Sequence, residues 1–165
     1  MSPYIELGHR EDQRDMKIET NNIAHLPEFV RLNELWISEH FSLEDADRAL
    51  AADPRKVIEN GGFVFSLESE GRVVGVCALF RESPERFQLA RMAVEPSLRG
   101  HGYGRMLMEH ALEHAISNGA KSVYLLSNTV LAAAIALYKR FGFITVSTGQ
   151  HPVYARCNIV MELPL

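Results

Sequence analysis

Three glycines stand at alternate positions in the run Arg99-Gly100-His101-Gly102-Tyr103-Gly104, between an apolar segment and an amphipathic one. The first amide N–H groups of a helix have no intrahelical partner and lie at the positive end of the helix dipole. Glycines at such a position let a ligand approach the backbone closely, and phosphate oxygens are the usual ligands. Arg99 and Arg105 add positive charge. The run therefore predicts a pyrophosphate site, with a glycine-rich turn that only caps a helix as the alternative.

Two other phosphate-binding motifs do not fit this run. A Rossmann fingerprint has the spacing G-x-G-x-x-G, whereas these glycines fall as G-x-G-x-G. Its ribose-binding acid should end the next strand, but that segment ends in Ser127-Asn128. A Walker loop needs Gly-Lys-Ser/Thr, which does not follow here. A nicotinamide dinucleotide is therefore a distant alternative.

A second pattern, His110-Ala111-Leu112-Glu113-His114, matches the H-x-x-E-H motif of some zinc proteases. The apolar face of this predicted helix consists of Leu107, Met108, Ala111, Leu112 and Ala115. Both histidines fall away from the centre of that face, and no context for a third ligand is evident. We therefore predict no metal site.

The charge is unevenly distributed along the chain. The formal net charge is −4, which argues against nucleic acid as a partner. Residues 1–86 hold 10 basic and 17 acidic side chains, residues 87–140 hold 6 and 3, and residues 141–165 hold one of each. The middle segment is the basic one, which fits an anion site there.

Hydrophobic periodicity and turn residues predict a single α/β domain over residues 16–165, preceded by an extension over 1–15. Ser42 is the expected N-cap of the second helix, which should end at Asp53-Pro54. The strands are expected at about 16–20, 63–68, 72–80, 87–94, 122–126, 143–146 and 158–163. The other helices are expected at about 24–40, from the glycine run to 117, and at 129–140.

The cysteines and the apolar runs bear on compartment. Cys77 and Cys157 lie in apolar runs, so a disulfide framework is not expected. Apolar runs of membrane-spanning length and a secretory signal are both lacking in the sequence. We expect a cytoplasmic protein that contacts neither membrane nor nucleic acid.

The run from Leu89 to Gly104 resembles motif A of the GNAT superfamily of N-acetyltransferases, whose core signature is Arg/Gln-x-x-Gly-x-Gly/Ala. Arg99, Gly102 and Gly104 meet that signature. Further on, Leu126-Ser127-Asn128 together with the run from Ala136 to Phe143 resembles motif B. The resemblance covers about residues 16–163.

This resemblance implies an α/β (α+β) fold with a mixed, mostly antiparallel central sheet flanked by helices. Strands 4 and 5 would splay apart and acetyl-CoA, the co-substrate, would enter between them. The backbone of Met92, Ala93 and Val94 would hold its pantetheine arm. The pyrophosphate would be held by the amides of Arg99, Gly100, His101, Gly102, Tyr103, Gly104 and Arg105. Ala132, Ala133 and Ala136 would lie along the cofactor, unless they simply face the core.

Acetyl transfer to an amine needs a neutral amine and a proton for the departing thiolate. An alkylamine with a pKa near 10.4 costs roughly 4.6 kcal/mol to deprotonate at pH 7. The resemblance makes Tyr138 the candidate general acid, with aromatic packing as the alternative role. It also places Asn128 near the cofactor or a bound water, although Asn128 could equally cap the following helix.

The general base is not evident. Several family members have a glutamate at the place of Gln88, and a glutamine cannot accept a proton usefully. The remaining candidates are Glu39, His40, Glu44 and His151. A base acting through water, or an amine that arrives neutral, would also serve.

The acceptor site is expected between the first helices and the loop before the last strand, as in the family. Its candidate residues are Trp36, Glu44, Gln88, Tyr154 and Arg156. Because residues 1–86 are acidic and supply much of this wall, we expect an acceptor that is cationic or neutral.

The predicted activity is direct transfer of an acetyl group from acetyl-CoA to a primary amine of a small molecule or an exposed amino group of a peptide. The competing hypothesis is a non-catalytic acyl-CoA-binding or regulatory module, favoured by Gln88. The resemblance also implies a possible homodimer.

Overall fold

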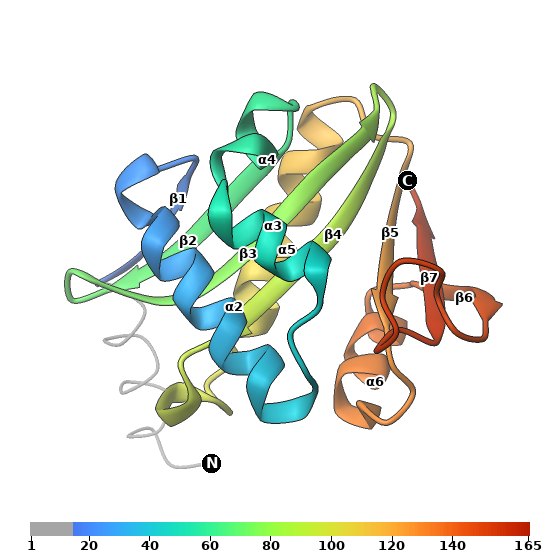
Figure 1. The fold of residues 1–165 in the computed structure, drawn as a ribbon. Coiled ribbons are helices and arrows are strands. Elements are labelled where there is room, and N and C mark those ends of the chain that lie inside the picture. Colours follow the sequence, from blue (N-terminus) through green and yellow to red (C-terminus); the bar gives the residue numbers. More distant parts are fainter. Residues whose placement is uncertain (1–14) are drawn as a thin grey trace, which may run out of the picture.

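The computed structural model describes residues 15–165, so the predicted extension falls, except for Asp15, outside the described residues. The described part contains one seven-stranded sheet in the order β1-β2-β3-β4-β5-β7-β6. Neighbouring strands are antiparallel except for β4 and β5, which are parallel. The mixed, mostly antiparallel sheet expected from the sequence is confirmed (Figure 1). The strands are β1 (Met16–Thr20), β2 (Phe63–Ser69), β3 (Arg72–Ser83), β4 (Arg86–Val94), β5 (Ser122–Ser127), β6 (Ile144–Thr148) and β7 (Ile159–Pro164).

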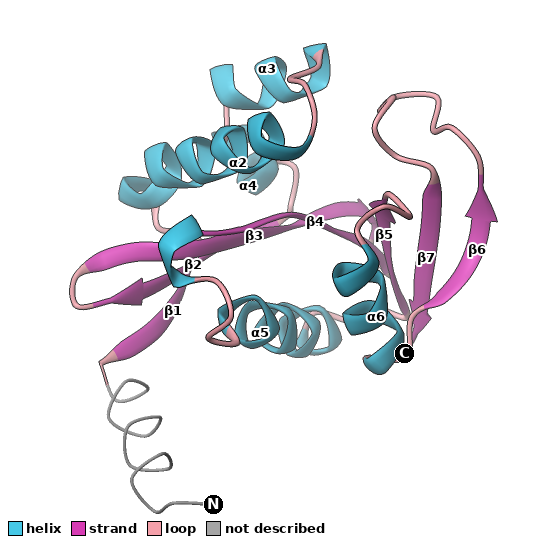
Figure 2. Cartoon of the chain, turned by 90° about the horizontal axis from the view of Figure 1, so that it is seen from below, coloured by secondary structure: helices cyan, strands magenta, loops and turns pink. Residues whose placement is uncertain are grey.

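Helices cover both faces of the sheet (Figure 2). One face carries α2 (Leu26–His40), α3 (Asp45–Ala52) and α4 (Arg55–Glu59), and the other carries α5 (Tyr103–Ser117) and α6 (Ala132–Arg140). Two 3₁₀ turns, Ile23–His25 and Pro96–Leu98, precede α2 and the glycine run. Each layer has its own buried core. Phe65, Leu79, Phe87, Leu107 and Met108 belong to the core under α5, whereas Phe29, Leu32, Val64 and Val76 belong to the core under α2.

The α5 helix forms where the periodicity predicted it. Leu107, Met108, Ala111, Leu112 and Ala115 are all buried, as the spacing of one helical face requires. The helix ends at Ser117, and Gly119 follows it with a φ of +84°. A residue in this left-handed region is the common way to end a helix, and glycine adopts it without strain.

The helices differ from the prediction in three respects. Ser42 is not the N-cap of α3: Glu44 is, and the Asp47 side chain accepts a hydrogen bond from its backbone N–H, so the capping box lies two residues later. The sequence prediction omitted α4, which begins directly after Pro54. The last helix begins at Ala132 rather than about 129, because Asn128 accepts a hydrogen bond from Val130 N in a turn.

The divergence of β4 and β5 is the feature that positions the site. Only three residue pairs join them, ending at Gln88 and Tyr124, although β4 continues to Val94. Figure 1 shows the two strands separating beyond this point. In the same stretch the pairing of β4 with β3 shifts, so that Arg91 and Met92 lie opposite the single residue Cys77. Such a bulge bends a strand and redirects its side chains.

Candidate active site

A cavity occupies the space that the divergence of β4 and β5 opens. It encloses about 890 Å³ of empty space, part of which is open to solvent. Its walls come from α2, β4, β5, α6 and the loop between β6 and β7. The lining residues are Asn33, Trp36, Ile37, Phe41, Phe80, Gln88, Leu89, Ala90, Arg91, Met92, Leu125, Leu126, Ser127, Asn128, Leu131, Ala134, Tyr138, Tyr154, Arg156 and Cys157.

Seven of the predicted site residues meet in this lining. They are Trp36, Gln88, Met92, Asn128, Tyr138, Tyr154 and Arg156. The other predicted positions are absent from it: Glu44, Ala93, Val94, Ala133 and the run from Arg99 to Arg105. Ala132, Ala133 and Ala136 are exposed, so the alternative that they face the core is wrong. The roles assigned to all these residues stay predictions.

Tyr138 reaches the cavity from α6. Its ring lies 6.1 Å from that of Phe143, centroid to centroid, in an edge-on arrangement. Burial raises the pKa of its hydroxyl to about 12, because an apolar environment disfavours the phenolate. The phenol is therefore protonated throughout the neutral range and can donate a proton into the cavity.

Asn128 and Gln88 are held by hydrogen bonds on the cavity wall. Asn128 donates from Nδ2 to the carbonyl of Arg156 at 2.7 Å, which ties β5 to the β6–β7 loop. It does not cap α6, whose N-cap residue is Leu131. Gln88 Oε1 lies 3.1 Å from Tyr124 Oη, and that hydroxyl also donates to Glu82 Oε1 at 2.6 Å. Burial and the Glu82 carboxylate raise the pKa of Tyr124.

The glycine run forms an open helix start. Gly100 and Gly102 have φ values of +85° and +81°, and a Cβ added at either would meet nothing within 4 Å. Gly102 is the N-cap of α5, and no side chain caps the helix there. A Cβ at Gly104 would lie 3.6 Å from Met92 Sδ, which places the run beside the end of β4. Unshielded amides at the positive end of a helix form a favourable environment for an anion.

The arginines of this run are already paired. Arg99 donates from both terminal nitrogens to Glu39, at 2.8 and 2.6 Å, and Arg105 donates to Glu109 at 3.1 Å. The Glu39 pairing raises the pKa of Arg99 further. The backbone therefore offers an anion more than these two side chains do.

A cluster of charged residues lies on the side of the cavity opposite the glycine run. Asp47 Oδ1 accepts hydrogen bonds from Arg91 Nη1 at 2.6 Å and Arg156 Nη2 at 2.8 Å, while its Oδ2 accepts from Arg156 Nη1 at 2.6 Å. Arg91 also donates to Tyr154 Oη at 2.9 Å. Glu44 accepts from Arg156 at 3.1 Å and from the Ala155 amide at 2.8 Å. The cluster joins three elements: α3 with its N-cap Glu44, β4 and the β6–β7 loop.

Burial within this cluster is nearly complete. The side chains of Asp47, Arg91 and Arg156 are 1, 7 and 12 % exposed. Burial alone would raise the pKa of the Asp47 carboxyl, but the hydrogen bonds from Arg156 and the Glu44 amide and the two positive charges outweigh it and leave that pKa lowered. The carboxylate is therefore ionised at neutral pH and holds both guanidinium groups in place.

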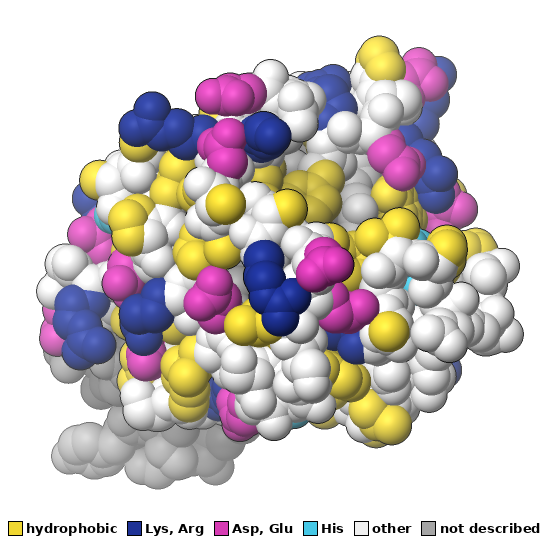
Figure 3. All heavy atoms as spheres, viewed as in Figure 1, with side chains coloured by type: hydrophobic (Ala, Val, Ile, Leu, Met, Phe, Trp, Pro, Cys, Tyr) yellow, Lys and Arg dark blue, Asp and Glu magenta, His cyan; other side chains and the backbone are white. Residues whose placement is uncertain are grey.

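The cavity wall has no acidic residue among those that the structure describes, and no histidine. Of the four candidate bases, Glu39 and Glu44 accept hydrogen bonds from arginines, and His151 accepts from the amides of Val153 and Tyr154. His40 packs its ring against Trp36, 5.0 Å away. The acidic wall expected from the charge distribution is therefore wrong for this cavity. The acids of residues 1–86 neutralise arginines instead, and Figure 3 shows basic and acidic side chains next to one another over this face.

Arg91, Asp47, Phe41 and Phe80 were not predicted as site residues. Arg91 lies within the motif A run, but it is not one of the residues of that signature. Asp47 could have been found as the N3 residue of a capping box whose N-cap is Glu44. The sequence around Phe41 and Phe80 contains no pattern that distinguishes a residue in a cavity wall from one in the hydrophobic core.

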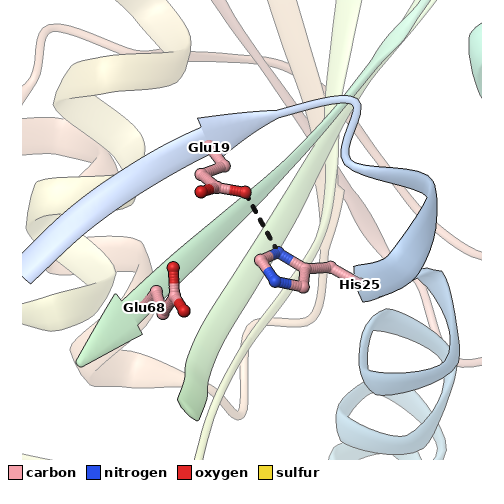
Figure 4. Close-up of side chains that lie close together, drawn as sticks. All are labelled: Glu19, His25 and Glu68. Atoms are coloured by element: carbon pink, nitrogen blue, oxygen red, sulfur yellow. Dashed lines mark ion pairs between the residues drawn. The ribbon is translucent and has the colours of Figure 1, made fainter. Parts of the chain in front are cut away.

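Two clusters away from the cavity also hold groups that can bind metals. Glu19, His25 and Glu68 lie together at the β1 edge of the sheet, with Glu19 and His25 pointing toward one another (Figure 4). Lys17 already lies 3.0 Å from Glu19 and 3.3 Å from Glu68, so an ammonium group balances these carboxylates. On α5, His110 and His114 pack against the ring of Phe65, both at 5.3 Å, and Glu113 is exposed. Both rings thus pack on an aromatic side chain, and their Nε2 atoms are buried without a hydrogen-bond partner among the described residues.

No helix in the range 15–165 has the length and apolar character needed to cross a membrane.

Residues 27–143 match the model of the acetyltransferase (GNAT) family. The chain is 31 % identical over 123 residues to streptothricin acetyltransferase of Streptomyces lavendulae, covering 67 % of this chain and 61 % of that protein. It is 35 % identical over 81 residues to ribosomal protein bS18-alanine N-acetyltransferase of Salmonella typhimurium, covering 47 % and 55 %. The chain thus spans less than two thirds of the length of either relative.

The fold is shared with a solved acetyltransferase structure from Salmonella typhimurium that contains its cofactor acetyl-CoA. The TM-score is 0.70 at 22 % identity, and the superposition covers 91 % of this chain and 94 % of that one.

Proposed function

This chain belongs to the GNAT acetyltransferase family, and on that premise we propose that it transfers the acetyl group of acetyl-CoA directly to a primary amine. The acceptor is a small molecule or an exposed amino group of a peptide, because the relatives' names include acceptors of both kinds. The observation that carries the proposal is the cavity between the diverging strands, with the protonated Tyr138 phenol in its wall.

The residues present suit acetyl-CoA, which supplies the acetyl group as a reactive thioester when bound. Beyond Gln88 the β5 side of β4 has no strand partner, so backbone groups around Met92, Ala93 and Val94 are free to bind the pantetheine amides. The open amides at Gly102 and the start of α5 suit the pyrophosphate. The exposed alanines Ala132, Ala133 and Ala136 leave room beside α6.

Among residues 15–165, the cavity wall supplies a group for one of the two proton transfers, protonation of the thiolate, but not for deprotonation of the amine. Tyr138 Oη stays protonated at neutral pH, because its pKa is raised to about 12, and it is the group that can hydrogen-bond to the departing thiolate and give it a proton. The described cavity wall has no carboxylate or imidazole to take the proton of the amine. We therefore infer that the amine loses its proton to water before or during binding. Gln88 can accept a hydrogen bond from the neutral amine and orient it.

Thiol release tests this function. The protein is mixed with acetyl-CoA and a panel of primary amines, and free thiol is followed. We expect Tyr138→Phe to lower kcat by roughly 10²- to 10⁴-fold, the usual contribution of a general acid, with little change in acetyl-CoA affinity. Tyr124→Phe is the comparison variant: its side chain is not part of the cavity wall, but its hydroxyl contacts Glu82 and Gln88, so we expect a smaller loss that appears in KM rather than in kcat.

Tight acetyl-CoA binding without thiol release for any amine would contradict catalysis and support the non-catalytic acyl-CoA-binding module. Equal losses in the two tyrosine variants would contradict the role of Tyr138 alone.

The free, buried Cys77 and Cys157 support a cytoplasmic location, where thiols stay reduced. A homodimer stays a prediction that the mass in solution would test.

A further inference from the structure

Arg91 and Arg156 are the charged residues of the described cavity wall. They enter it from β4 and from the β6–β7 loop, on the side opposite the glycine run. Their counterions, Asp47 and Glu44, are not part of the wall. A ligand in this part of the cavity therefore meets guanidinium groups, with the carboxylates behind them.

The two guanidinium groups are fixed in position. Asp47 accepts hydrogen bonds from both, at 2.6 to 2.8 Å. The Tyr154 ring lies next to both, with its centroid 5.5 Å from Arg91 Cζ and 4.8 Å from Arg156 Cζ. Groups held this way lose little conformational freedom when a ligand binds, which is what a recognition site requires.

Hydrogen-bonding capacity remains on both arginines. A guanidinium has five N–H donors. The hydrogen bonds within residues 15–165 use two from Arg91 and three from Arg156, which donates twice from Nη1 and once from Nη2. The planar donor pairs that remain match the two oxygens of a carboxylate.

The backbone at Arg91 has a strained conformation of the kind found at ligand-binding positions. Its φ is +59°, in the left-handed region that side chains other than glycine, asparagine and aspartate rarely adopt. It lies at the bulge where two residues of β4 oppose Cys77. Such strain is concentrated at ligand-binding positions, because packing alone can be achieved without it.

Several large apolar side chains also line this cavity, next to the polar Asn33 and Gln88. Trp36, Ile37 and Phe41 contribute from α2 and its C-terminal end, and Phe80 contributes from β3. An acceptor that fits must have an apolar body as well as an anionic group.

We propose that the acceptor amine also carries a carboxylate, as an amino acid with an apolar side chain does, and that Arg91 and Arg156 bind this carboxylate. The proposal rests on the proposed function and names its substrate class. Asp47 is a positioning residue in this arrangement, because it orients both guanidinium groups and contacts no substrate. The cluster is neutral before the ligand binds, since two arginines face Asp47 and Glu44.

Matched acceptors test the proposal on the unmodified protein. Phenylalanine, phenylalaninamide and phenethylamine share one apolar body and one amine but differ in the carboxylate; leucine, leucinamide and isoamylamine form a second series. We expect kcat/KM for the acid to exceed that for the amide and for the simple amine by roughly 10- to 100-fold, the range of a charged hydrogen bond. The amide has the least basic amine of each series, so a preference for the acid cannot come from amine protonation.

Conservative variants assign the effect to the arginines. Arg91→Lys and Arg156→Lys keep the charge opposite Asp47 but lose the planar donor pair. We expect each to reduce the preference for acid over amide at least fivefold, because kcat/KM for the acid falls further than kcat/KM for the amide. Arg48→Lys, on the exposed side of α3 where it pairs with Asp45, is the matched control and should leave the preference unchanged.

The outcomes separate the two proposals. Thiol release with simple amines or amides at rates equal to or above those for the acids would overturn the carboxylate proposal and leave the acetyltransferase function standing. Absence of thiol release with every acceptor would overturn the function itself. An unchanged preference in both folded lysine variants would also overturn the carboxylate proposal. If a variant fails to fold, the acceptor series on the unmodified protein decides alone.

Discussion

The two sides of the cavity are built in different ways. The β4–α5 side consists of residues that are close together in the sequence, from Met92, which lines the cavity, to the adjacent glycine run that ends at Arg105. The opposite side depends on side chains from distant segments: Asp47 is 44 residues from Arg91 and 109 from Arg156. We refer to them as the cofactor side and the acceptor side.

This contrast indicates which residues of the site can be replaced without affecting the others. Backbone amides at a helix start bind phosphate whatever the neighbouring side chains are, so the cofactor side tolerates change outside its glycines. The acceptor side depends on a buried ion cluster in which each member needs the others. Replacement of one member there should affect both the fold and the choice of acceptor.

The largest expected effect comes from Asp47→Asn. The substitution keeps the shape of the side chain but leaves two nearly buried guanidinium groups facing a neutral amide. We expect the free energy of unfolding to fall by about 3–5 kcal/mol, as when one partner of a buried ion pair is removed. Chemical denaturation measures it, and acetyl-CoA affinity should persist at temperatures where the variant is folded.

Asp45→Asn is the matched control, because Asp45 is fully exposed and pairs only with the exposed Arg48. Its effect should stay below about 1 kcal/mol. Similar losses in both variants would show that the acceptor side has no special dependence on its buried cluster.

An intermediate effect is expected from Gly102→Ala on the cofactor side. Alanine at a φ of +81° is strained by about 1–2 kcal/mol. Its Cβ would also project into the open space beside the first amides of α5. We expect the Kd for acetyl-CoA to rise by about tenfold, equivalent to ~1.4 kcal/mol, while the ranking of acceptors does not change.

Gly119→Ala separates strain from binding. Gly119 has a φ of +84° and equally open space, but it follows the other end of α5. It should lose similar stability with unchanged acetyl-CoA affinity, as isothermal titration would show. A tenfold loss of affinity in this variant too would mean that the effect arises from helix destabilisation.

Acidification should act in two steps, of which the first is the smallest expected effect. Burial lowers the pKa of His114, and the His110 charge lowers it further, from an ordinary value of 6.5. The unfolded chain therefore binds this proton more readily, and the free energy of unfolding falls as the pH drops below about 6.5. Asp47 has a lowered pKa relative to 3.8, so its contribution is present above pH 3.8 and is lost below it.

His114→Gln tests the order of these steps in denaturation curves taken across the acid range. The first decline should shrink and the second should remain, because His114 belongs to neither side of the cavity. Loss of the second decline in this variant would show that α5 and the acceptor side are coupled.

Much of the fold could be predicted because its signals are local. The burial of Leu107, Ala111 and Ala115 follows from spacing along one helix, and Gly119 marks the end of that helix. The separate helix α4 was missed because Asp53-Pro54 ends one helix and a proline also starts the next. The N-cap Glu44 was missed because Ser42, two residues earlier, is an equally plausible N-cap.

The open helix start of the cofactor side could be predicted from its motif, whereas the ion cluster of the acceptor side could not. Arg156 and Tyr154 were candidates only through the family resemblance, and the charge balance of whole segments pointed to an acidic wall. That inference failed because net charge along a sequence does not say which acids pair with which arginines. Asp47, Arg91 and Arg156 meet only when the sheet and its loops have assembled.

The separation between Asp47 and Arg156 also has a consequence during synthesis. A chain grows at roughly 5–20 residues per second, so the 109 residues between these two side chains take about 5–20 s to add. Throughout that interval Asp47 lacks its second partner, although Arg91 becomes available after 44 residues. The glycine run is thus synthesised well before Arg156, and the acceptor side is the last part of the site whose residues are all present.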